Sequence, residues 1–246
     1  MGRIIPINNV QNQPKFTKIV LIMVLVVVFF LLFFTSPLFS VQKIEIRGNE
    51  HYSEEKILEK INFHLNQNIF LFQQKKAEKL LCKDPYIESA SIEVKWPNHV
   101  RIQIDERKVV GYVPYVGTYL YIDKDGRVLE TSPTYKDHLP IVQGLEFDHF
   151  EIGEIIPVKN KSSLNIVAVM AQMMLKYDLL EDIIKIDVSD PTDTHVYVKK
   201  LDVSMGNIEE FDKKIQWMIQ IMNVYDMGKV DLKNIDKGRA VFSPLT

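Results

Sequence analysis

Apolar and polar positions divide this chain into one long apolar run near its start and a remainder in which they alternate over short periods. Residues 19–34 contain no charge, amide or hydroxyl, and reading on to residue 39 gives a segment of 21 residues. As an α-helix this segment would be about 31 Å long, close to the ~30 Å hydrocarbon core of a bilayer. The pattern therefore predicts one transmembrane helix over residues 19–39, surrounded by the lipid bilayer.

The charges that flank this run predict its orientation. Arg3, Lys15 and Lys18 precede it, and the first acidic residue is Glu45. Because basic residues favour the cytoplasmic side, residues 1–18 are expected to form a cytoplasmic tail and the rest an extracytoplasmic part, as in a type II single-pass membrane protein. A cleaved signal peptide is the alternative, but its apolar part usually spans about 7–15 residues and ends at a small-residue cleavage site, which this sequence lacks.

The extracytoplasmic part is mildly acidic and has a single cysteine. Three of the 30 basic residues and none of the 32 acidic residues precede residue 41, so the remainder has a net charge of −5. This charge argues against a nucleic-acid partner, which would require a basic face. Cys82 has no second cysteine with which to form a disulfide. Because it follows Leu80 and Leu81 in a predicted helix, we expect Cys82 to be a small buried apolar side chain.

Residues 41–108 predict a compact α+β domain of strand, helix, helix, strand and strand. The elements are a strand over residues 41–47, helices over 53–62 and 73–83, and two strands joined by a turn at Pro97 and Asn98. Ser53 is a suitable N-cap for the first helix. The predicted core faces of the last two strands consist of Ala90, Ile92, Val94 and Trp96, and of Val100, Ile102 and Ile104.

Residues 109–246 predict a mixed β domain with two longer helices. Strands are expected over residues 109–113, 119–122, 127–130, 183–188, 195–198, 202–205, 229–232 and 239–242, and helices over 162–177 and 208–224. The first helix is predicted to bury Leu164, Val167, Ala168, Ala171, Met174 and Leu175, and the second Ile208, Phe211, Ile215, Met218, Ile219 and Met222. Glu209 and Glu210 are predicted to pair with Lys213 and Lys214 across one helical turn.

The acidic turn at residues 123–126 only partly matches a calcium-binding loop. If Gly126 takes the sixth position, Tyr121 and Ser132 fall where a ligand Asp and a bidentate Glu belong, so a turn between two strands is the better interpretation. The six histidines are scattered without metal-site spacing, and no nucleophile or phosphate-loop motif occurs. We therefore assign no catalytic, metal or cofactor site and no small-molecule substrate, while a pair of glycosidase carboxylates from distant segments stays open.

Three stretches of the chain resemble the FtsQ/DivIB family of bacterial cell division proteins: VQKIEIRGNEHYSEEKIL, DPYIESASIEVKWPNHVRIQIDER and YIDKDGRVLE. The family's order of basic tail, single span, POTRA domain and C-terminal β domain matches nearly the whole chain. The resemblance implies a POTRA fold for residues 41–108 and a β domain for 109–246. It also implies a non-enzymatic scaffold of the division machinery, located at the septum. A general membrane-tethered POTRA module for interaction or protein transport is the alternative.

The last strand supplies the candidate partner-binding site. No further strand is predicted after it, so one edge of its backbone is expected to be open to a partner's strand. The resemblance implies the same region, because family members receive FtsB/DivIC-like proteins there, which are themselves paired with FtsL-like proteins. The matching positions are Val230, Asp231, Leu232, Gly238, Ala240, Val241 and Phe242. Lys233 and Asn234 depart from the Arg and aromatic residue frequent in the family, and the alternative is that the last strand merely closes the sheet.

Overall fold

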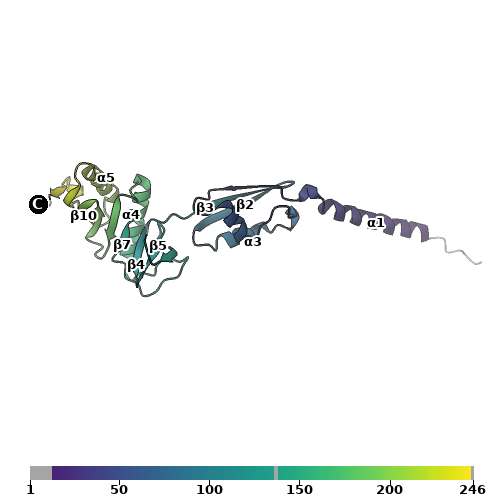
Figure 1. Ribbon diagram of the computed structural model, residues 1–246, viewed down its shortest axis with the longest axis horizontal. Helices are drawn as coiled ribbons and strands as arrows, with labels where there is room; N and C mark the ends of the chain where they lie inside the picture. Colours follow the sequence, from purple (N-terminus) through teal and green to yellow (C-terminus); the bar gives the residue numbers. More distant parts are fainter. Residues whose placement is uncertain (1–12, 136–137, 245–246) are drawn as a thin grey trace, which may run out of the picture. The chain divides into compact units, whose positions relative to one another are not determined.

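The computed structural model describes residues 13–135 and 138–244, in two compact units (Figure 1). The first unit consists of Met1–Leu81 and Ala90–Ile104, and the second of Cys82–Ser89 and Asp105–Thr246. The first twelve residues of the predicted cytoplasmic tail, with Arg3, lie outside the described residues.

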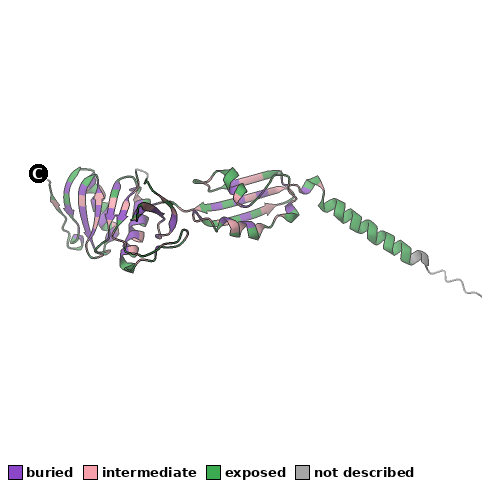
Figure 2. Cartoon of the chain, turned by 60° about the horizontal axis from the view of Figure 1, so that its bottom comes forward, coloured by how far each residue is buried: buried purple, intermediate pink, exposed green. Residues whose placement is uncertain are grey.

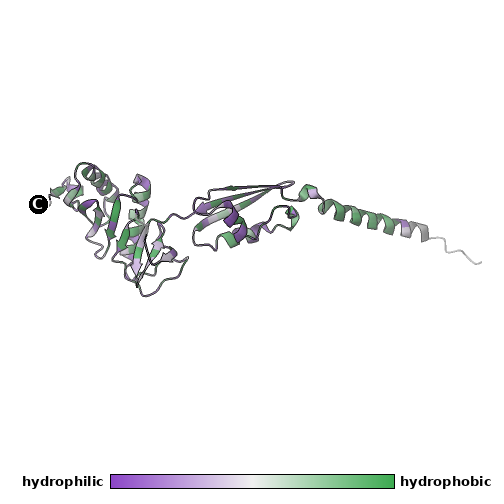
Figure 3. Ribbon diagram, in the orientation of Figure 1, coloured by the Kyte–Doolittle hydropathy of each residue, from purple (hydrophilic) through white to green (hydrophobic). Residues whose placement is uncertain are grey.

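The first element is α1 (Gln13–Phe34), whose residues 16–34 are apolar enough and long enough to cross a membrane. All of the described side chains on this helix are exposed (Figure 2), and those of residues 19–34 are all apolar, as the hydropathy colouring of the ribbon shows (Figure 3). The α-helix begins before the predicted residue 19 and ends at Phe34. Residues 35–39 form a turn and the short 3₁₀ helix η1 (Pro37–Phe39), which Ser36 caps. Proline at 37 disfavours helical geometry at the preceding residue and so ends α1.

A three-stranded sheet with two α-helices and one 3₁₀ helix follows, as predicted for a POTRA fold. Its strands β1 (Lys43–Arg47), β2 (Ile87–Lys95) and β3 (His99–Glu106) lie in the order β1-β3-β2, and its helices are α2 (Glu54–Lys60), η2 (Ile69–Leu71, a 3₁₀ helix) and α3 (Gln74–Leu81). Ser53 caps α2 by accepting a hydrogen bond from the backbone N–H of Lys56 at 3.3 Å, which confirms the predicted start. Ile57, Ala77 and Leu81 are buried in this domain.

Two predicted core positions are wrong in this region. Cys82 is exposed, because α3 ends at the fully buried Leu81 and the next residue points away from the buried face. Trp96 is predicted to lie on the core face with Ile92, but it is 57% exposed. It lies past the end of β2, in the turn that leads to β3.

The second unit is built on a nine-stranded mixed sheet. Its strands are β4 (Gly111–Tyr115), β5 (Thr118–Ile122), β6 (Val128–Ser132), β7 (Ile141–Gln143), β8 (Ile183–Asp187), β9 (Thr194–Val198), β10 (Lys200–Gly206), β11 (Met227–Asp231) and β12 (Val241–Ser243), in the order β12-β11-β10-β9-β8-β7-β4-β5-β6. Two helices, α4 (Lys161–Tyr177) and α5 (Phe211–Met222), contribute to one apolar core with the strands. The predicted fold class, α+β with a C-terminal mixed β domain, is confirmed, although the sequence pattern did not predict β7.

The buried side of α4 is only partly the predicted one: Val167, Ala171 and Met174 are buried as predicted. Ile166 and Met170 are buried, whereas Leu164 is only partly buried and Leu175 is exposed. A helix of 17 residues has several overlapping apolar stripes. The stripe that is buried in the structure includes the polar residue Ser163. The hydroxyl of Ser163 donates to the carbonyl of Val188 at 3.0 Å, which satisfies it inside the core.

The second helix begins later than predicted, at Phe211 rather than residue 208. Glu210 takes a left-handed conformation with φ of 52° just before it. Lys214 is 2% exposed and donates to the backbone carbonyl of Asn207 at 2.9 Å, so its predicted pairing with Glu210 is wrong. Burial lowers the pKa of Lys214. Lys213 instead approaches Glu210, with 3.9 Å between Nζ and Oε2.

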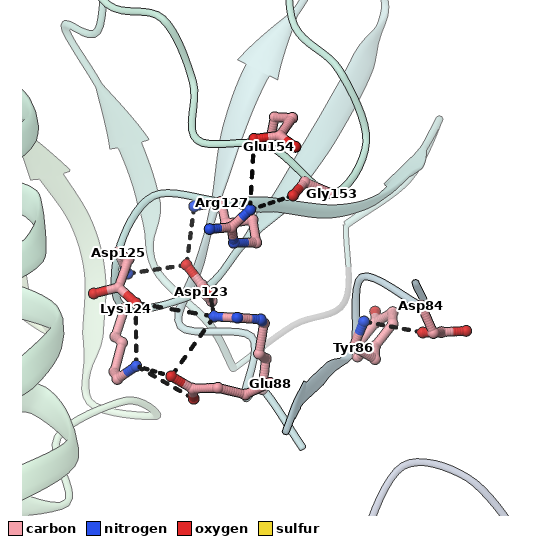
Figure 4. Close-up of polar contacts among 10 residues, drawn as sticks. Asp84, Tyr86, Glu88, Asp123, Lys124, Asp125, Arg127, Gly153 and Glu154 are labelled. Carbon is pink, nitrogen blue, oxygen red and sulfur yellow. Dashed lines mark hydrogen bonds and ion pairs between the residues drawn. The ribbon is translucent and has the colours of Figure 1, made fainter. Parts of the chain in front are cut away.

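The β5–β6 turn holds a polar cluster around the buried side chain of Asp123 (Figure 4). Its Oδ1 accepts hydrogen bonds from the backbone N–H groups of Asp125 and Arg127, both at 2.9 Å. Its Oδ2 accepts from Nη1 of Arg107, also at 2.9 Å. Both carboxylate oxygens of Asp123 are therefore hydrogen-bonded within the protein. Asp123 stabilises the turn, and its charge is paired with that of Arg107.

We predict that Asp123→Ala lowers the free energy of unfolding of the second unit by roughly 3 kcal/mol, because it leaves Arg107 and two backbone N–H groups without their buried acceptor. The measurement is urea unfolding of the full chain in detergent, followed by Trp217 fluorescence in a Trp96→Phe background. Trp217 lies on α5 and so reports on the same unit.

The matched control is Asp125→Ala, which keeps the backbone N–H that binds Asp123. The Asp125 side chain is 42% exposed and pairs with Lys124, so its loss should cost less than about 1 kcal/mol. Equal effects of the two substitutions would contradict the role assigned to Asp123.

Candidate partner-binding edge

Strands β11 and β12 form one end of the nine-stranded sheet. β11 runs parallel to β10, with Val203 opposite Val230. β12 runs antiparallel to β11, with Val230 opposite Phe242 and Asp231 opposite Val241. Within residues 138–244, β12 pairs only with β11, so its second edge faces no other strand of the described chain.

The seven candidate residues divide into core and surface positions. Val230 and Leu232 are 2% and 0% exposed and belong to the hydrophobic core. Phe242 is partly buried and packs against the same core. The exposed members are Asp231, Gly238, Ala240 and Val241. The structure therefore brings together the β11 and β12 positions as cross-strand pairs, while Gly238 and Ala240 lie in the connection between the strands.

The ring of Phe242 lies on Tyr225, a residue of the loop between α5 and β11. Their ring centroids are 4.0 Å apart and the rings are inclined by 24°, an almost parallel stack. Gly228 makes room for this arrangement, because a Cβ at that position would lie 2.5 Å from Cε2 of Phe242. Gly228 also has a φ of +146°, which disfavours other residues. The position of β12 thus depends on the stack of Phe242 on Tyr225 and on the absence of a side chain at Gly228.

Exposed apolar side chains occur on β12, at the start of β11 and in the loop before it. Val224, Tyr225, Met227 and Val241 are 71, 44, 46 and 58% exposed. An unpaired backbone edge on a strand with an exposed apolar side chain has the chemistry of strand addition, in which main-chain hydrogen bonds supply affinity and side-chain contacts supply specificity.

Lys233, which departs from the family pattern, is engaged within the protein. Its Nζ lies 2.8 Å from Oδ1 of Asp193, which also accepts from the Ser204 hydroxyl at 2.8 Å. The hydrogen bond between the two charged groups raises the pKa of Lys233 and lowers that of Asp193. The backbone N–H of Leu232 donates to the carbonyl of Ser204 at 2.9 Å. These contacts hold the segment after β11 against β10.

A short turn then reverses the chain toward β12. The 3₁₀ helix η3 (Ile235–Lys237) inserts the buried Ile235 and ends at Gly238, whose φ of +70° is left-handed. Gly238 therefore acts through backbone conformation, since no other atom lies within 4 Å of where its Cβ would be.

Sequence reasoning missed two residues of this edge, Tyr225 and Gly228. An isolated glycine in a strand signals a close approach of other atoms, and that signal was available at Gly228. Tyr225 lies in a loop, outside any periodic pattern, and only the fold brings it to Phe242.

The β-α-α-β-β module, preceded by a membrane-length helix and followed by a mixed β domain, defines a protein of the POTRA class. Residues 39–107 match the family model of the POTRA domain, FtsQ-type, and residues 111–236 match that of the cell division protein FtsQ/DivIB, C-terminal. The chain belongs to the FtsQ/DivIB family of cell division proteins.

Similar proteins carry the name cell division protein DivIB. That of Clostridium botulinum strain Hall is 28% identical over 238 residues, which cover 94% of this chain and 93% of the relative. The Clostridium acetobutylicum protein is 27% identical over 212 residues, 84% of each chain. The Bacillus cytotoxicus protein is 30% identical over 141 residues, 54% of each chain. The similarity to the first of these therefore extends over both the POTRA domain and the β domain.

We predict that Gly228→Ala loosens β12, because the added Cβ collides with the ring of Phe242 and with the carbonyl oxygen of Ser243. Amide hydrogen exchange of residues 241–243 in the full chain should become at least about tenfold faster, which corresponds to ~1.4 kcal/mol.

Gly117→Ala is the control for the backbone effect. Gly117 also has a positive φ, of +76°, but no other atom lies within 4 Å of the place that an added Cβ would take. Exchange at residues 241–243 should be unchanged in this variant. Unchanged exchange in Gly228→Ala as well would show that the glycine is not needed for the stack.

Proposed function

We propose that this protein is a non-enzymatic, single-pass scaffold of the bacterial division machinery, which recruits a partner by strand addition at β12. The observation that carries the proposal is the position of β12 as the outermost strand of the sheet, paired on one side by β11. Membership of a family of cell division proteins supports the cellular role.

The proposed topology has the N-terminus in the cytoplasm and both folded units outside. The apolar, exposed residues 19–34 of α1 support insertion, since a soluble helix would need a polar face. Lys15 and Lys18 precede the apolar run and Glu45 is the first acidic residue after it, which supports this orientation. We propose residues 41–108 as the POTRA domain and 109–246 as the β domain.

The proposed partners are an FtsB/DivIC-like protein at the β12 edge and the FtsL-like protein paired with it. The partner's strand would lie beside Val241 and Phe242, and its side chains would contact the apolar residues around Tyr225. Confinement to the same membrane supports such an assembly, because it raises the effective concentration of single-span partners for one another.

We predict that Val241→Pro weakens binding of the DivIC-like partner about tenfold or more, because proline removes a backbone N–H and restricts the strand. The measurement is co-purification of the two full-length proteins from detergent-solubilised membranes, followed by titration. Val241→Thr is the matched control, since it keeps the N–H and the β-branched side chain, and it should bind within about threefold of the original protein.

Circular dichroism of each purified variant checks that the fold is retained. Undiminished partner binding by the folded Val241→Pro protein would contradict strand addition at β12.

A second prediction concerns location in the cell. A fluorescent protein fused to the N-terminus and produced at native levels should form a band at midcell in dividing cells. A uniform membrane signal would contradict the division role and favour a general membrane-tethered POTRA module for interaction or protein transport.

A further inference from the structure

Five large apolar side chains of the first unit are exposed outside α1 in its described residues, and we call them the apolar tip: Leu38, Leu65, Phe70, Leu71 and Trp96. Their exposed fractions are 54, 58, 42, 79 and 57%. None lies in a strand or an α-helix. They come from η1, from the segment that ends in η2, and from the turn between β2 and β3.

These segments meet at one end of the three-stranded sheet. β1 and β3 are parallel, with Lys43 opposite His99, so both begin at this end, and the turn that joins β2 to β3 lies there too. The segment before η2 joins them, because the backbone N–H of Val41 donates to the carbonyl of Gln67 at 2.9 Å. The apolar tip is therefore one feature of the fold, assembled from distant parts of the sequence.

A chain of aromatic rings connects the apolar tip to the last turn of α1. Phe34 contacts Phe70 with ring centroids 4.8 Å apart, and Phe70 contacts Trp96 at 4.7 Å. Phe39 lies 4.9 Å from Phe70 and 5.1 Å from Phe33. The side chain of Asn68 also donates to the carbonyl of Phe34 at 2.6 Å, where the helix leaves its last carbonyls without intrahelical partners.

The length of the helix places the apolar tip relative to a bilayer. The span of 19 residues from Phe16 to Phe34 is about 28 Å long, nearly the ~30 Å thickness of the hydrocarbon core. When α1 crosses a membrane, Phe34 therefore lies at the boundary of the hydrocarbon. Phe70, which contacts Phe34, and Trp96, which contacts Phe70, then lie in the headgroup layer. This layer adds roughly 5–7 Å on each side of the hydrocarbon core.

We propose that the apolar tip inserts into the headgroup layer of the leaflet on the side of the POTRA domain, with Trp96 as its interfacial anchor. The occupant of this surface is phospholipid, because the surface continues directly from the lipid-facing helix. Tryptophan favours this layer, where its ring is shielded and its N–H stays near water. The inference rests on the membrane anchoring proposed above and adds a second attachment, which would fix the domain at the membrane surface.

The two tryptophans of the chain allow a direct test. Trp217→Phe leaves Trp96 as the single fluorophore, and Trp96→Phe leaves Trp217, which lies on α5 of the second unit. Each full-length variant is reconstituted into phosphatidylcholine and phosphatidylglycerol vesicles with plain or brominated acyl chains, since bromine quenches nearby tryptophan. Bromine placed near the headgroup end should reduce Trp96 emission at least about twofold, and bromine near the methyl end should quench it less, as expected for an interfacial ring. Trp217 emission should not change.

Two aspartate variants link the quenching to the apolar tip. In the Trp217→Phe background, Leu71→Asp should reduce the quenching of Trp96, because a charge beside it opposes insertion. Val116→Asp is the control, since Val116 is 90% exposed but lies in the β4–β5 turn of the second unit, and it should leave the quenching unchanged.

Equal Trp96 emission in plain and brominated vesicles would overturn the inference and favour a protein partner as the occupant. Quenching of both tryptophans would also overturn it, because it would mean unspecific adsorption of the whole ectodomain. Flotation of the vesicles after alkaline extraction reports separately on insertion of α1, and loss of flotation would overturn both the anchoring and this inference. The division role is tested by midcell localisation, so its failure is distinguishable from that of the apolar tip.

Discussion

The parallel pairing of β10 with β11 determines the architecture at the C-terminal end of the sheet. Two parallel neighbours cannot be joined by a tight hairpin, so the chain between them must cross back over the sheet. Here that crossover contains α5, which covers the core with Ile215 and Met218. The turn at η3 then reverses the chain, and β12 becomes the outermost strand because it adds to the far side of β11.

An outermost strand and a membrane surface recognise their partners by different physics. The backbone of β12 offers hydrogen bonds that any extended chain can form, so selectivity must come from side chains such as Val241 and Phe242. The apolar tip needs no defined partner sequence, because the affinity of a protein surface for lipid depends on its exposed apolar area and its aromatic side chains. The apolar tip belongs to the first unit and β12 to the second, so each surface is a property of its own unit.

Several particular residues show how far sequence reasoning reaches. The cap at Ser53 and the turn around Asp123 are predictable because the signals lie within a few residues of the structure they form. Lys214 is predicted as the ion-pair partner of Glu210, but it is buried and bound to Asn207. Cys82 is predicted to be buried, but α3 ends at Leu81, two residues before the predicted end, and Cys82 is exposed. The error at Cys82 follows from the misplaced end of α3, whereas Lys214 lies three residues after Phe211 on the buried side of α5, where only the fold supplies the Asn207 carbonyl that its amine binds.

By itself the sequence determined the membrane-length helix, the β-α-α-β-β module and most of the later strands and helices, because those elements depend on periodicity and on capping between near neighbours. Only the tertiary structure decided the strand order, the stack of Phe242 on Tyr225 and the position of Trp96 beside Phe70. These features depend on contacts between segments far apart in the chain. Such contacts form only when packing and backbone pairing are satisfied together, which no local pattern records.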